Sequence, residues 1–135
     1  MITTPVKAVA TACTVAAALA VTFVPVAPAK GGDGVRVDGT CSDSSTSKLE
    51  AKHDDGRIEV EFEVDQNRNG VLWNVALRRD GRLVFAGARR TVAPSGSFSV
   101  ERKVTGGAQN ATIRARATRN GAVCSATVTL PARVA

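Results

Sequence analysis

Groups that catalyse reactions are scarce in this sequence. It has no tyrosine and one histidine, His53, and it contains neither a G-x-S-x-G segment nor a C-x-x-C pair. A nucleophile–histidine–acid triad or a redox-active dithiol therefore has too few residues to draw on. Although Asp54 and Asp55 follow His53, we interpret this histidine as a strand-end residue beside a polar turn. The sequence predicts a protein that is not an enzyme.

Aromatic side chains are also few, at 4% of the chain. We expect most of Phe62, Trp73, Phe85 and Phe98 to be buried, which leaves no platform on which nucleic-acid bases could stack. Nucleic acid is therefore not expected as a partner. Carbohydrate binding is weakly supported for the same reason.

The first 29 residues have the features of a targeting segment. A short basic start precedes an apolar run over 8–26, and Ala27-Pro28-Ala29 gives the small-x-small pattern that signal peptidase cleaves. A retained membrane anchor is the alternative, but the run is rich in alanine and threonine and is only weakly hydrophobic. We predict a secretory signal peptide over 1–29, a flexible leader over 30–34 and one domain over 35–132. The mature chain has no membrane span, and we expect it to be extracellular or associated with the cell wall.

Two of the three cysteines, Cys41 and Cys124, lie outside the predicted signal peptide. In an exported chain they are expected to pair and to close a loop of roughly 80 residues. The formal net charge is +6, which favours attraction to anionic surfaces. Arginine outnumbers lysine and valine outnumbers isoleucine, a preference typical of GC-rich bacterial genomes.

Apolar and polar residues alternate in short runs separated by turn residues, a period of two that indicates β-strands. Strands are predicted over 35–40, 46–53, 57–65, 71–79 and 97–104, with others paired across the turns Asp80-Gly81 and Asn120-Gly121. No convincing amphipathic helix is present. We predict an all-β fold, an immunoglobulin-like two-sheet antiparallel sandwich of about seven or eight strands with one disulfide.

Both two-residue turns fix a hairpin register. Around Asn120-Gly121 one face is wholly apolar and the other wholly polar, with the pairs Ala117–Cys124, Ala115–Ala126, Ile113–Val128, Ala111–Leu130, Arg116–Ser125, Arg114–Thr127 and Thr112–Thr129. Around Asp80-Gly81 the predicted pairs are Leu77–Val84, Val75–Ala86 and Trp73–Ala88 inward, and Arg78–Leu83, Ala76–Phe85 and Leu72–Arg89 outward. The second outward face is less polar than a solvated face usually is.

Two surfaces follow as binding candidates. Leu72, Leu83 and Phe85 form an apolar patch on the second hairpin, which we interpret as a protein-contact surface; a covering loop or a shifted register are the alternatives. The outer faces of the two sheets are expected to carry opposite charge, with Glu59, Glu61 and Glu63 on one and Arg78, Arg114 and Arg116 on the other. Either stripe can be an ordinary solvated face. A functional basic face would bind an anionic partner such as a wall polymer.

The segment Asp65-Gln66-Asn67-Arg68-Asn69-Gly70 matches the first half of a calcium loop. Asp65, Asn67 and Asn69 stand where ligands 1, 3 and 5 would be, but the twelfth position is Ala76 rather than glutamate. We therefore interpret the segment as a turn in which Asn69-Gly70 accepts positive φ and Asp65 and Asn67 bond to nearby backbone. No cofactor is expected; a weak calcium site is the alternative.

The segment GRIEVEFEVDQNRNGVLWNVALRRDGRLVFAGARRT and the following APSGSF resemble small secreted proteins of actinobacteria, a family to which no activity is assigned. The resemblance implies export, a β-rich fold and the disulfide, and it transfers no function. We predict a non-catalytic binding or cell-surface interaction module, whose partner is a protein or an anionic cell-wall component. The alternative is an inhibitor of extracellular hydrolases that uses the loop 42–47 or 91–97.

Overall fold

The computed structural model describes residues 34–106 and 109–133. The predicted signal peptide over 1–29 and most of the predicted leader lie outside these residues. The first strand begins at Gly34, one residue earlier than expected. Within the described residues, no helix is long and apolar enough to cross a membrane.

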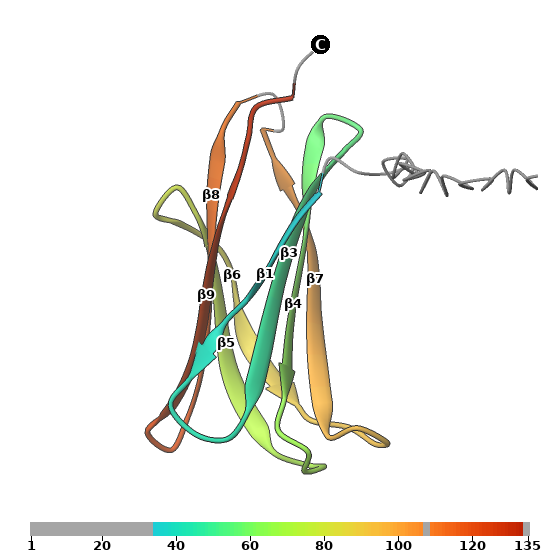
Figure 1. Cartoon of the computed structure of the whole chain (residues 1–135), viewed down its shortest axis with the longest axis vertical. Helices are drawn as coiled ribbons and strands as arrows, with labels where there is room; N and C mark the ends of the chain where they lie inside the picture. The colour runs from blue at the N-terminus through green and yellow to red at the C-terminus, as the bar shows by residue number, and fades with distance from the viewer. Residues whose placement is uncertain (1–33, 107–108, 134–135) are drawn as a thin grey trace, which may run out of the picture.

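Nine strands form two antiparallel sheets among the described residues. One sheet has the order β1-β3-β4-β7, and its strands are β1 (Gly34–Asp38), β3 (Thr46–Asp54), β4 (Arg57–Asp65) and β7 (Ser97–Thr105). The other has the order β2-β9-β8-β5-β6, and its strands are β2 (Thr40–Cys41), β9 (Ala122–Leu130), β8 (Ala111–Arg119), β5 (Leu72–Arg79) and β6 (Arg82–Arg90). Figure 1 shows the two sheets as facing layers.

The core lies between the sheets because alternate residues of each strand point inward and most of these residues are apolar. The largest fully buried side chains include Trp73, Phe62, Leu49, Ile58 and Leu77, and these come from both sheets. The predicted fold class, an all-β two-sheet antiparallel sandwich with one disulfide, is confirmed. The strand count is higher than expected because the predicted first strand, 35–40, is divided.

This division moves the chain from one sheet to the other. β1 pairs with β3 in the four-stranded sheet, and β2 pairs with β9 in the five-stranded sheet. Gly39 makes the crossing, and a Cβ there would lie 2.6 Å from the Ser125 carbonyl oxygen. Glycine is therefore required by the close approach of the two sheets.

The disulfide lies within one sheet. Cys41 and Cys124 are direct partners in the β2–β9 pair, and their Cα atoms are 4.0 Å apart. The predicted pairing is confirmed. The bridge holds the short β2 onto the edge of the five-stranded sheet instead of joining the two sheets, as an immunoglobulin bridge would.

The two hairpin predictions had different outcomes. The register around Asn120-Gly121 is confirmed at every predicted pair. The register around Asp80-Gly81 is correct only at Arg78–Leu83, because a β-bulge follows. Beyond the bulge, each predicted pair is wrong by one residue of β6. The observed pairs there are Leu77–Phe85, Ala76–Ala86, Val75–Gly87, Asn74–Ala88, Trp73–Arg89 and Leu72–Arg90.

The bulge turns Phe85 inward, where it closes the open side between the edge strands β6 and β7. The Phe85 ring packs against the core, with the Arg102 and Arg89 guanidinium carbons 4.4 and 5.0 Å from its centroid. Arg102 is paired with the buried Val60 and so stands at an inward position of β7. Inward-pointing charges and bulges on edge strands oppose pairing with another chain. These long edges are therefore poor sites for adding a strand.

Candidate functional site

The outer face of the five-stranded sheet has an unusual charge distribution. Every charged residue in β2, β5, β6, β8 and β9 is an arginine: Arg78, Arg79, Arg82, Arg89, Arg90, Arg114, Arg116 and Arg119. By strand register, Arg78, Arg90, Arg114 and Arg116 lie on the outer face, and the other four lie on the inner side near the edges of the sheet. The four-stranded sheet mixes acidic and basic residues and contains Glu59, Glu61 and Glu63. The predicted separation of these glutamates from Arg78, Arg114 and Arg116 onto different sheets is confirmed.

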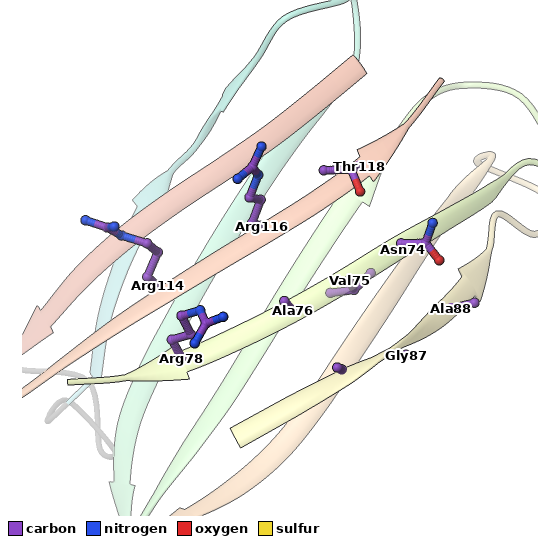
Figure 2. Close-up of a pocket in the computed structure, with 10 residues that line it drawn as sticks. Asn74, Val75, Ala76, Arg78, Gly87, Ala88, Arg114, Arg116 and Thr118 are labelled. Atoms are coloured by element: carbon purple, nitrogen blue, oxygen red, sulfur yellow. The ribbon is translucent and has the colours of Figure 1, made fainter. Parts of the chain in front are cut away.

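A groove of about 570 Å³ lies on this outer face, over β5, β6 and β8. Its lining residues are Asn74, Val75, Ala76, Arg78, Ala86, Gly87, Ala88, Arg114, Arg116 and Thr118 (Figure 2). The lining includes all three arginines that the sequence nominated. We define this set as the basic groove.

Strand register explains how the basic groove is built. Three cross-strand rows follow one another: Leu83–Arg78–Arg114, then Ala86–Ala76–Arg116, then Ala88–Asn74–Thr118. Since alternate residues of a strand share a face, these rows are roughly 7 Å apart. The alanines of the second and third rows provide a low floor. The longer side chains rise around it and make the sheet surface concave.

The three arginines of the basic groove have no acidic neighbour on their own sheet. The four ion pairs between described residues involve none of them. Arg78 donates a hydrogen bond of 3.3 Å to the Gly81 carbonyl, and Arg78 and Arg114 are direct cross-strand partners. Like charges placed opposite each other destabilise a sheet. An anion bound between these side chains would relieve this repulsion.

The opposite outer face carries both signs of charge and pairs several of them, although Glu61 stands between Glu50 and Glu101. Arg36 and Glu50 are 2.7 Å apart, and Lys52 and Glu59 are 3.1 Å apart. A hydrogen bond from Lys103, 2.6 Å from Asp54, lowers the pKa of the Asp54 carboxyl. The same bond raises the pKa of Lys103. This face has mixed charges with three ion pairs between described residues, whereas the charges that line the basic groove are all positive.

The structure does not bring Leu72, Leu83 and Phe85 together. Leu72 and Leu83 are 49% and 47% exposed, but they pair with Arg90 and Arg78 near opposite ends of β5. Phe85 points to the other side of the sheet because Val84 is the extra residue of the bulge. The predicted apolar patch is therefore wrong. Asn74, Thr118 and the floor alanines were missed, because the sequence contains no signal that places β5 beside β8.

The segment Asp65–Gly70 forms a turn with the hydrogen bonding expected of Asp65. Its Oδ1 accepts a 2.9 Å bond from the Asn67 N–H. Positive φ occurs at Asn67 (57°) and at Gly70 (77°). The predicted positive φ is therefore confirmed at Gly70 and wrong at Asn69. A Cβ on Gly96 would lie 2.7 Å from the Asn67 carbonyl carbon, so this turn packs tightly against the β6–β7 connection.

We expect calcium to have no effect on this turn. One oxygen of Asp65 already accepts a backbone hydrogen bond, and the chain supplies no acid at the twelfth position of the loop. The melting temperature of the purified protein should be the same in EDTA and in millimolar calcium, since a ligand stabilises only the state that binds it. An upward shift in calcium that is lost in a D65N variant would show that the turn is a metal site.

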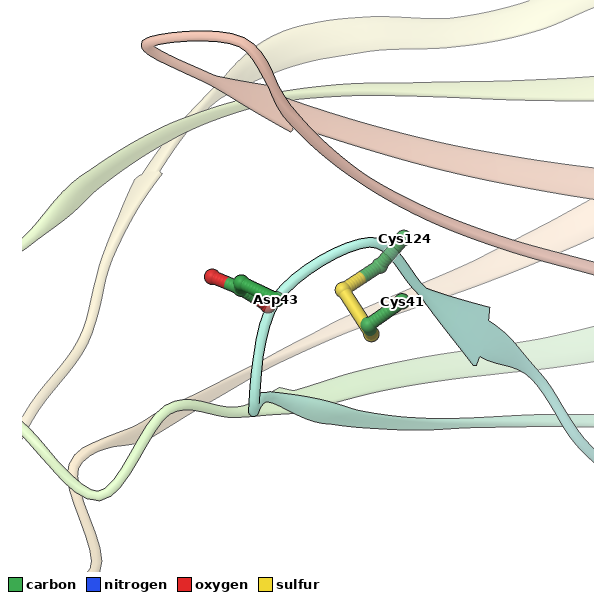
Figure 3. A group of neighbouring side chains, drawn as sticks. All are labelled: Cys41, Asp43 and Cys124. Atoms are coloured by element: carbon green, nitrogen blue, oxygen red, sulfur yellow. A yellow bond between two sulfur atoms is a disulfide. The ribbon is translucent and has the colours of Figure 1, made fainter.

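The two other groups of potential ligands are used structurally. Cys41, Cys124 and Asp43 lie close together, but the two sulfur atoms are bonded to each other (Figure 3). Asp43 Oδ1 accepts the Ser45 N–H at 3.0 Å and so shapes the turn after β2. His53 Nε2 lies 2.8 Å from the Pro131 carbonyl oxygen and donates to it, which fixes the chain after β9.

The loops 42–47 and 91–97, which were considered for an inhibitor, lie at the same end of the sandwich (Figure 1). Ser42 exchanges hydrogen bonds with Val123, which holds the first loop to β9. The second loop is held by the buried Thr91, whose hydroxyl accepts the Val71 N–H at 2.9 Å and donates to the Arg68 carbonyl at 2.5 Å. Both loops are well anchored, and hydrolase inhibition stays a prediction.

No protein-family model, curated protein or solved structure matches this chain.

Proposed function

We propose that the protein is a non-catalytic, extracellular binding module whose basic groove takes an anionic polymer. One observation carries the proposal: arginine is the only charged residue type on the five strands that form this face, and three arginines line a groove there. The lining contains no acidic residue, histidine or cysteine that could act as a general base or nucleophile. Its chemistry favours binding over turnover.

Arginine suits this role because its planar guanidinium forms paired hydrogen bonds with carboxylates and phosphates. The groove is shallow and spans three strands and three rows, roughly 10 by 14 Å. Such a surface contacts several units of an extended polymer. Each charged contact is weak at a solvated surface, so the affinity for the polymer comes from several contacts repeated along the polymer chain.

Neutralising the three arginines tests the proposal. The R78Q/R114Q/R116Q variant is expected to bind labelled polygalacturonate and poly-L-glutamate at least roughly tenfold more weakly than wild type, because three charge-assisted contacts are lost. Fluorescence anisotropy at low ionic strength gives the affinities. Wild-type binding should weaken as salt is added.

The matched control is R36Q/K48Q/R57Q, which removes the same charge from the four-stranded sheet. It should bind like wild type. If both variants bind the polymers equally more weakly than wild type, net charge alone attracts the polymer and the basic groove has no specific role. Unchanged binding by the R78Q/R114Q/R116Q variant would also contradict the proposal.

A further inference from the structure

The two ends of the basic groove differ in chemistry. Arg78 and Arg114 lie at one end, Asn74 and Thr118 lie at the other, and Ala76 and Arg116 form the row between them (Figure 2). Asn74 and Thr118 are cross-strand partners, so the amide and the hydroxyl stand side by side. Arg116 and Thr118 are two residues apart on β8, so they share the outer face and their Cα atoms are roughly 7 Å apart.

Asn74 and Thr118 are available to a ligand. None of the side-chain hydrogen bonds between described residues involves the Asn74 amide or the Thr118 hydroxyl, although other exposed side chains such as Thr112 and Asn110 do form them. Together the two side chains offer both donors and acceptors. An anionic group alone can use only the donors. A partner that carries hydroxyl groups can use both.

We propose that the polymer bound in the basic groove is a glycan built of carboxylated sugar units. This inference rests on the proposed function and specifies its ligand. A uronate-type ring carries a carboxylate and free hydroxyls on one unit, which fits the short distance from Arg116 to Thr118. The Ala76, Ala86 and Ala88 methyl groups form an apolar floor on which the C–H face of a ring can lie.

The size of the basic groove agrees with this ligand, and its lack of aromatic residues determines how the ligand is recognised. A volume of about 570 Å³ lies within the range of small-molecule sites, so a short stretch of glycan fills it. No aromatic side chain lines the groove, so the sugar is recognised by charge and hydrogen bonds instead of by stacking. Single units therefore bind weakly, and a chain of units is required for measurable affinity.

The N74A/T118V variant tests the inference while leaving all three arginines in place. Its affinity for polygalacturonate should fall by roughly tenfold, since two hydrogen-bonding groups are removed. Its affinity for poly-L-glutamate, a polycarboxylate without hydroxyls, should stay within about twofold of wild type. The control T112V/T129V removes two hydroxyls from the same outer face outside the groove lining and should change neither affinity.

The outcomes separate this inference from the proposed function. One outcome is that R78Q/R114Q/R116Q binds both polymers more weakly, while N74A/T118V changes the two affinities equally or changes neither. In that case the groove binds polyanions without recognising hydroxyl groups, and the glycan inference is wrong. If the arginine variant weakens neither polymer, the proposed function itself fails. Poly(glycerol phosphate) provides a third arm: tighter binding of this polymer than of polygalacturonate would assign the site to phosphodiesters and overturn the carboxylated sugar.

Discussion

Replacing both Cys41 and Cys124 with alanine is expected to lower the free energy of unfolding by about 4.5 kcal/mol. The two cysteines are 83 residues apart in sequence, so the bridge closes a long loop and lowers the conformational entropy of the unfolded chain. The chain-entropy relation for a loop of this length gives the quoted value. In a domain of this size the loss corresponds to a fall in melting temperature on the order of 20 °C.

The position of the bridge makes a second effect visible. β2 has only two residues, and both of its pairing partners are in β9. Without the bond, the β1–β2 segment should lose protection from hydrogen exchange before the rest of the sandwich does. Wild type treated with a reductant should behave like the double variant. A double variant within about 1 kcal/mol of wild type in urea denaturation would show that the bridge adds little to stability.

Replacing Trp73 with alanine is expected to lower the free energy of unfolding by about 3–5 kcal/mol. The side chain is fully buried near the start of β5, and its ring centroid lies 6.5 Å from that of Phe98 on the facing sheet. Its Nε1–H donates a 3.0 Å hydrogen bond to Gln66 Oε1. Alanine therefore opens a large cavity and also leaves a half-buried amide oxygen without its donor.

Two matched variants divide this effect into its parts. W73F keeps an aromatic ring and loses the indole N–H, so it should be less destabilising than W73A. L72A, at the neighbouring half-exposed position, should cost less than about 1 kcal/mol. Because Trp73 is the only tryptophan, denaturation must be followed by circular dichroism rather than by fluorescence. If W73A and L72A have similar stabilities, the core does not depend on the indole.

Local sequence patterns were sufficient to predict most of the fold. In β4, apolar residues alternate with acidic ones, and this pattern predicted that the apolar residues lie in the core. They are Ile58, Val60, Phe62 and Val64, and all four are fully buried. Asn120-Gly121 fixed the register of β8 and β9 because a two-residue turn sets the first pairs and no bulge interrupts this hairpin. The same alternation assigned Arg114 and Arg116 to the outer face of the sheet.

The errors arose from a bulge in one hairpin and from a pairing between strands that are distant in sequence. One extra residue, Val84, shifts the register of β6 and turns Phe85 from the outer face to the inner one, which removed the predicted apolar patch. A strand has a period of two, so a single bulge reverses every later assignment. The basic groove depends on β8 lying beside β5, and these strands are more than thirty residues apart. No turn fixes that neighbour, and therefore Asn74 and Thr118 could not be predicted.

Amide chemical shifts during a titration with short polygalacturonate chains test the location of the binding site most directly. We predict that the shifts which change lie on the outer face of the five-stranded sheet, at Asn74–Arg78, Ala86–Ala88 and Arg114–Thr118. Amides of β3 and β4 on the opposite sheet should stay unchanged. Changes centred on β3 and β4, or no change at saturating polymer, would contradict binding in the basic groove.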